Sequence, residues 1–220
     1  MTVVALLLAG VGLADLLPRW RHAAALLVVV AGALGLGAGW HTLWIALLVL
    51  LVVVVWLDAA SHRSTAGTRA LAVSLVGLLV ASPALRFSDA PLQRWYDALP
   101  VPALATVPLE RAALAVGVLL FLATAANVVV RQALEAVGPH VLQEEQALKG
   151  GRLLGPLERW LVFGFAVAGH VAALGALVAA KGILRFPEIS RDTADGMRAE
   201  YVLVGSFVSW TLALVAAPLF

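Results

Sequence analysis

The 220-residue sequence contains no cysteine and few charged residues. The absence of cysteine excludes disulfide bonds and thiolate metal ligands. Charged residues make up 13% of the chain and hydrophobic residues 62%, whereas soluble domains contain roughly 25% and roughly 45–50% of these classes. A chain of this composition cannot cover its apolar surface in water. The composition therefore predicts a membrane protein.

The sequence also has no large excess of charge of either sign, because it contains 15 basic and 13 acidic residues. No stripe of basic residues is present to neutralise phosphates, so we expect no nucleic-acid partner. Lysine is scarce, with two residues against thirteen arginines, and Ala, Val and Gly are abundant. This usage indicates a GC-rich bacterial genome. We expect a multi-pass protein of the bacterial inner membrane.

The apolar residues form continuous runs of Leu, Val, Ala and Gly, which is typical of helical spans and not of a barrel wall. A helix needs about 20 apolar residues to cross a bilayer. The sequence predicts an all-α integral membrane protein with six or seven transmembrane helices, at Thr2–Leu17, Ala23–Gly39, Leu43–Leu57, Ala70–Leu85, Ala112–Val130, Leu157–Ala180 and Tyr201–Leu219. We expect the short first run to be a retained span, because no basic region precedes it as in a signal peptide.

Two connections have the pattern of amphipathic helices that lie in the headgroup layer. Ser88–Leu99 places Leu92 and Trp95 on one helical face, and Arg131–Lys149 also has an apolar side. Six of the seven tryptophans lie near predicted span ends or in these connections, as an aromatic belt would predict: Trp20, Trp40, Trp56, Trp95, Trp160 and Trp210. The predicted organisation is one membrane domain over residues 1–220. It comprises an N-terminal bundle (1–130), an amphipathic connector (131–155) and a C-terminal helical hairpin (156–220) that packs through small residues.

Ionisable residues near predicted span ends form a first candidate site. Asp15 and Asp58, together with His22 or His62, have the chemistry to bind a divalent cation that acts on a lipid phosphate. Alternatively, the two carboxylates form structural salt bridges with Arg131 or Arg159. The remaining candidate binding residues on this side are Asn127, Arg131, Glu158 and Arg159. No spacing is diagnostic of a metal site, so we favour the structural interpretation and expect no cofactor.

A second cluster lies on the opposite side of the predicted bundle. Lys181 and Arg185 follow one span and Glu200 opens the next, which suits the dipoles of the two helix ends. The cluster predicts either an anionic-headgroup site or a salt bridge from Lys181 or Arg185 to Glu200 or Glu188, and we favour the salt bridge. His170 lies inside the predicted sixth span. A packing hydrogen bond is favoured there over a proton relay.

Three blocks of the C-terminal third carry a family resemblance: residues 151–159 (GRLLGPLER), residues 180–186 (AKGILRF) with Glu188, and residues 199–206 (AEYVLVGS) with Ser209. In these blocks the chain resembles a bacterial membrane-protein family, domain of unknown function 3307, which has no established activity. The resemblance implies a membrane protein and singles out Glu158, Arg159, Lys181, Arg185 and Glu200. Members often carry a histidine four residues before the first aspartate, where this chain has Val11.

These observations leave more than one function open. The leading hypothesis is a non-enzymatic helical membrane protein that binds a lipid, an ion or a partner subunit through its polar clusters. Its partners are then membrane lipids and either a second copy of the chain or another membrane subunit. The alternatives are a metal-dependent enzyme acting on a lipid phosphate and a small transporter.

Overall fold

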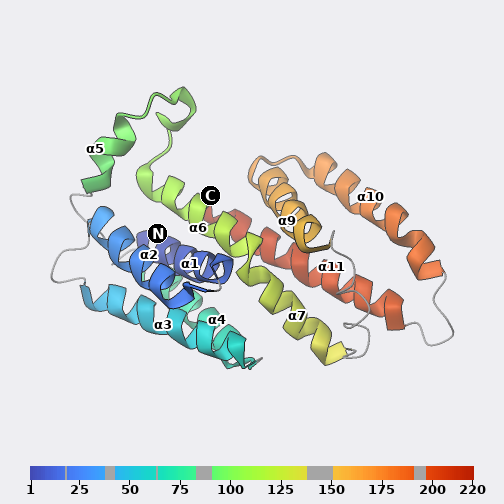
Figure 1. The fold of residues 1–220 in the computed structure, drawn as a ribbon. Coiled ribbons are helices and arrows are strands. Elements are labelled where there is room, and N and C mark those ends of the chain that lie inside the picture. Colours follow the sequence, from blue (N-terminus) through green and yellow to red (C-terminus); the bar gives the residue numbers. More distant parts are fainter. Residues whose placement is uncertain (18, 38–42, 63, 83–90, 138–150, 191–196) are drawn as a thin grey trace. The chain divides into compact units, whose positions relative to one another are not determined.

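The computed structural model describes residues 1–17, 19–37, 43–62, 64–82, 91–137, 151–190 and 197–220 (Figure 1). Every regular element within these ranges is a helix, which confirms the all-α prediction. The chain divides into two compact units, Met1–Ala125 and Ala126–Phe220. The division falls next to Thr124, where the helix predicted over Ala112–Val130 is interrupted. Each unit is described by itself.

The first unit is built around its N-terminal helix. It contains α1 (Thr2–Leu16), α2 (Arg21–Gly35), α3 (Leu43–Ser61), α4 (Ala66–Ala81), α5 (Pro91–Asp97), the 3₁₀ turn η2 (Pro102–Leu104) and α6 (Leu109–Ala123). Helix α1 packs against α2, α3 and α6, and 11 of its residues are buried. A helix that is apolar on all sides is expected in such a surrounded position. This short apolar helix is thus the core of the first unit.

Glycines let α1 and α6 approach each other until their backbones touch. A Cβ atom added to Gly117 would lie 2.7 Å from the carbonyl oxygen of Ala5, and one added to Gly12 would lie 2.6 Å from the backbone of Leu120. The hydroxyl of Thr124 donates a hydrogen bond to the Gly12 carbonyl at 2.7 Å. Close backbone contact at small residues is the usual way in which helices associate within membranes.

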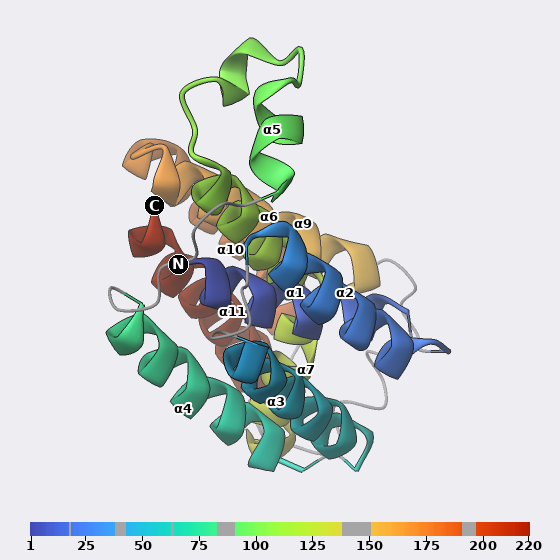
Figure 2. The ribbon, with the colours of Figure 1, turned by 90° about the vertical axis from the view of Figure 1, so that its left-hand side faces the viewer.

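The outward faces of this unit carry large apolar side chains. On α3, Ile45, Val49 and Val53 are buried at a spacing of four residues, whereas Leu47 and Leu51 are exposed. On α4, which lies beside α3 in Figure 2, Val73 and Val80 are more than 70% exposed. Both helices therefore carry apolar side chains on their buried face and on their exposed face, as helices surrounded by lipid do.

The second unit contains α7 (Ala125–Val137), α9 (Gly151–Val167), α10 (Val171–Ser190), α11 (Met197–Ala216) and the 3₁₀ turn η3 (Ala217–Leu219). The prediction of one continuous span over Leu157–Ala180 is wrong. The helix stops at Val167, Gly169 takes a φ of 70°, and α10 starts at Val171. A positive φ is accessible to glycine at no steric cost and reverses the chain here. His170 therefore lies exposed at a turn and not inside a span.

Two further expectations for this unit need correction. Helix α9 begins at Gly151, six residues before the predicted start at Leu157, so Pro156 is an interior residue of the helix and one helical hydrogen bond is lost there. The C-terminal region is also not a simple hairpin of two helices. Helix α11 packs chiefly on α9, and the rings of Phe163 and Phe220 meet edge to face at 5.4 Å. Among the described residues, a Cβ atom added to Gly175 or Gly182 of α10 would contact nothing within 4 Å, so the predicted small-residue packing is not observed there.

Three helical segments are long and apolar enough to cross a membrane: Trp44–Ser61, Leu109–Glu135 and Glu200–Leu219, of 18, 27 and 20 residues. Shorter apolar helices cover Thr2–Leu16, Arg21–Gly35, Ala66–Ala81 and Val171–Leu184. The three long segments support a membrane protein. The number of spans remains a prediction.

Candidate functional site

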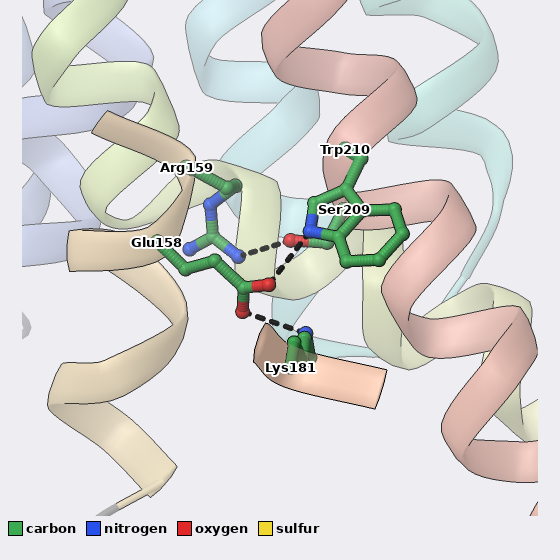
Figure 3. A network of polar contacts seen from close by, with 5 residues as sticks. All are labelled: Glu158, Arg159, Lys181, Ser209 and Trp210. Atoms are coloured by element: carbon green, nitrogen blue, oxygen red, sulfur yellow. Dashed lines mark hydrogen bonds and ion pairs between the residues drawn. The ribbon is translucent and has the colours of Figure 1, made fainter. Parts of the chain in front are cut away.

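The main polar cluster of the second unit is organised by Glu158 of α9 (Figure 3). One carboxylate oxygen, Oε2, accepts a hydrogen bond from Nζ of Lys181 at 2.6 Å, and the other, Oε1, accepts one from Nε1 of Trp210 at 2.7 Å. Lys181 belongs to α10 and Trp210 to α11, so a single carboxylate connects three helices. The ammonium of Lys181 also lies 5.1 Å from the centroid of the Trp210 ring, within the range of a cation–π contact.

The next residue, Arg159, is 2% exposed and makes its own set of contacts. Its Nη2 donates to Oδ1 of Asn127 on α7 at 2.6 Å, and its Nη1 donates to Oγ of Ser209 on α11 at 3.3 Å. Gly155 lies one turn earlier on α9, and a Cβ atom added there would make an ordinary van der Waals contact with the guanidinium, 3.5 Å from Nη1. Consecutive helical residues point about 100° apart, so Glu158 and Arg159 reach different neighbours from one turn of α9.

Several of the predicted site residues meet in this cluster. The cluster contains Asn127, Glu158, Arg159 and Lys181. The last three of these are among the five residues that the family resemblance singles out. The structure pairs Lys181 with Glu158, a partner that was not predicted from the sequence. Glu200 is exposed in the first turn of α11, and Arg131 is exposed on α7. The side chains of Arg185 and Glu188 lie outside the described part of the chain.

Sequence reasoning assigned no site role to Trp210, which it placed in an aromatic belt. The signal that could have found it is the pair Ser209-Trp210 on α11. Two adjacent hydrogen-bonding side chains in the mainly apolar part of a helix need partners, and Arg159 and Glu158 on α9 supply them.

The carboxylates of the first unit have separate surroundings. Asp15, at the end of α1, accepts a hydrogen bond at 3.2 Å from Nε1 of Trp56, which is 1% exposed in α3. Trp56 was also expected in an aromatic belt and is instead a core residue. Asp58 is 73% exposed and lies 3.7 Å from Nε2 of His62, one turn along α3. His22 is exposed on α2.

The described residues contain no group of three or more His, Asp or Glu side chains that could hold a metal ion. The proposed metal ligands Asp15, Asp58, His22 and His62 are all among those residues. Within the first unit the partner of Asp15 is Trp56. The arginines predicted to pair with it, Arg131 and Arg159, belong to the second unit.

The hydrogen-bonding capacity of the Glu158 cluster is largely used within the cluster. Both carboxylate oxygens of Glu158 have donors, and Arg159 uses both terminal nitrogens. Among the described residues, no buried side-chain nitrogen or oxygen is left without a hydrogen bond. A hydrogen-bonded network of this kind fixes the positions of the helices that it connects.

Comparison with known proteins returned no matching family model, no matching curated protein and no matching solved structure.

Proposed function

We propose that this chain is a multi-pass protein of the bacterial inner membrane that works by binding membrane lipids or a partner membrane subunit, and not by catalysis. One observation carries the proposal. In the second unit, large apolar side chains face outward and charged side chains face inward. Ile183 and Leu184 on α10 are more than 70% exposed, whereas Glu158 and Arg159 on α9 are turned inward. Within the 20-residue apolar segment Glu200–Leu219, the buried residues are Tyr201, Ser209 and Ala213.

Physical chemistry favours a bilayer around such a surface. Exposed apolar area costs about 25 cal/mol per Å² in water, and water-soluble monomers rarely expose large contiguous apolar patches. In lipid the same side chains cost nothing, while charged groups must find partners inside the protein. The ion pair of Glu158 and Lys181 meets that requirement.

Seven spans are the arrangement that we propose, made of the three long apolar segments and the four shorter apolar helices. Helices of 15 residues extend about 22 Å at 1.5 Å per residue, against a hydrocarbon core of about 30 Å. The short helices α1 and α2 therefore require either local thinning of the bilayer or residues beyond their ends. Helix α9, which carries the charged residues and Pro156, then lies among the spans as a packing element.

Binding is favoured over catalysis because the polar groups are committed to one another. The Glu158 cluster satisfies its own donors and acceptors, and Asp15 has its donor in Trp56. Apart from Asp58 and Arg69, the large exposed side chains that the structure describes on α3, α4 and α10 are apolar. Lipid chains and the apolar faces of other membrane helices are the ligands that such surfaces bind.

The absence of cysteine makes a topology experiment straightforward. Single cysteines at Arg19, Thr65 and Thr106 would mark the α1–α2, α3–α4 and α5–α6 connections. We expect a membrane-impermeant maleimide to label the first two from one side of sealed vesicles and the third from the opposite side. Release of the unmodified chain from membranes by alkaline carbonate would refute the proposal.

A second experiment separates binding from catalysis. Native mass spectrometry of the protein released from membranes should show bound lipid or a second subunit. A protein that leaves the membrane with neither, and that hydrolyses a lipid phosphate in a metal-dependent assay, would instead be an enzyme.

A further inference from the structure

The segment between α4 and α6 contains a short helix and a closed turn that stand apart from the packed helices of the first unit (Figures 1 and 2). The turn is held by Tyr96, which is 8% exposed. Its hydroxyl donates a hydrogen bond to the carbonyl oxygen of Val107 at 2.9 Å, and the carbonyl oxygen of Leu104 lies 3.5 Å away. One inward-facing tyrosine therefore connects α5 to the start of α6.

The neighbouring side chains face the other way. Trp95 is 60% exposed and Leu92 is 40% exposed, and at a spacing of three residues they share one side of α5. Gln93 and Asp97 occupy the opposite side and are hydrogen-bonded to each other at 2.8 Å, with Arg94 exposed near them. Helix α5 is thus amphipathic, and the exposed part of its apolar side contains a tryptophan.

The position of the segment along the chain determines what can cover Trp95. Leu92 lies against the end of α2, where a Cβ atom added to Gly35 would be 3.0 Å from its Cδ1. The other end of the segment runs directly into Leu109, the first residue of a long apolar segment. The surface of α5 is therefore placed where one apolar helix ends and another begins. In a membrane protein this is the boundary between acyl chains and headgroups.

We propose that residues 91–108 form a surface anchor that lies in the headgroup layer of the membrane. Trp95 and Leu92 reach toward the acyl chains, and Arg94 lies among the lipid phosphates. Tryptophan is enriched at this depth because its ring is apolar and its N–H is polar. The hydrogen bond from Tyr96 keeps the turn closed and so holds Trp95 toward the lipid. This inference rests on the membrane setting proposed above, and it adds a lipid-contacting element that does not cross the bilayer.

The test uses an environment-sensitive fluorophore on single cysteines in nanodiscs of phosphatidylcholine and phosphatidylglycerol. The probe site is Trp95→Cys, and the matched control is Asp97→Cys, on the polar side of the same helix. We expect the label at Trp95→Cys to be quenched more by lipids with a spin label near the headgroup than by lipids labelled deep in the chain. Iodide in water should have little effect on it. The label at Asp97→Cys should be quenched more by iodide than by either spin-labelled lipid.

Two other outcomes would refute the proposal that residues 91–108 form a surface anchor. Equal quenching of both labels by iodide would mean that α5 projects into water. A label at Trp95→Cys that neither lipid nor iodide quenches would mean that protein covers this face. Both results leave carbonate resistance intact and so refute the anchor without refuting the membrane protein. In the Tyr96→Phe background, the label at Trp95→Cys should lose part of its lipid quenching, because the turn is no longer fastened to Val107. Unchanged quenching there would show that Tyr96 does not hold the anchor.

Discussion

Glu158 and Lys181 lie 2.6 Å apart although 23 residues separate them along the chain. Gly169, with its positive φ, stands almost midway between the two. A reversal at Gly169 therefore brings the two residues to the same level of the α9–α10 hairpin. The position of the glycine determines which charged residues can meet.

The first prediction concerns this ion pair. Glu158→Gln leaves the ammonium of Lys181 without its counter-charge, at a site where the two side chains are 11% and 23% exposed. We expect the protein to lose about 2 kcal/mol of stability, which is less than for a fully buried pair. The measurement is unfolding in detergent followed by tryptophan fluorescence, which also reports on Trp210.

Two further variants isolate the pair from general effects. Glu110→Gln removes an exposed carboxylate from the first turn of α6 and should change stability little. Lys181→Met combined with Glu158→Gln completes a double-mutant cycle, for which we expect a coupling energy of about 1 kcal/mol or more. Additive effects of the two changes would show that the pair does not stabilise the hairpin.

The second prediction concerns the turn itself. Gly169→Ala forces a side chain into the left-handed region at φ 70° and should destabilise the protein by about 1–2 kcal/mol. Gly169→Asn should cost less, because asparagine tolerates this conformation. Gly164→Ala is the matched control, since an added Cβ atom there meets nothing within 4 Å among the described residues. Equal effects at the two glycines, measured by thermal unfolding, would argue against a hairpin turn at Gly169.

The third prediction concerns the contact of α1 with α6. Gly117→Ala places a methyl group 2.7 Å from the carbonyl oxygen of Ala5, so the two helices must separate. We expect a loss of about 1–3 kcal/mol, as for other overpacked sites. Gly77→Ala on α4 is the control, because its added Cβ atom contacts none of the described residues within 4 Å. A lower unfolding temperature for both variants alike would indicate general helix effects instead of this contact.

The sequence predicts the helical class because long continuous apolar runs can be read without any knowledge of tertiary contacts. Three of its predicted spans correspond to long apolar segments in the structure. The hairpin inside Leu157–Ala180 could not be predicted in the same way. Gly169 lies in a continuous apolar run, and nothing in hydropathy distinguishes a glycine inside a helix from one at a turn. The charge of Glu158 and Lys181 at similar distances from Gly169 is the clue that hydropathy ignores.

The candidate site was predicted in part for a related reason. Charged residues are easily recognised within apolar stretches of a sequence, so Glu158, Arg159 and Lys181 could be predicted as site residues. Their partners include Trp210 and Ser209, which are common in membrane helices and carry no charge. Trp56 shows the same difficulty, because a tryptophan near a span end fits an aromatic belt as well as a hydrogen bond to Asp15. Which of the two occurs depends on tertiary packing.

The last prediction compares the two aspartates of the first unit. Trp56→Phe removes the donor that Asp15 faces at 3.2 Å, and it should cost about 2 kcal/mol, as for hydrogen bonds to charged groups. Asp15→Asn keeps an acceptor oxygen and should have a smaller effect. Asp58→Asn should leave the unfolding temperature unchanged, because Asp58 is 73% exposed and interacts only weakly with His62. If a divalent ion instead joins the two aspartates, equilibrium dialysis will show a stoichiometric ion that both Asp15→Asn and Asp58→Asn remove. That result would require the two carboxylates to converge, and the metal-dependent enzyme would then replace the binding protein proposed here.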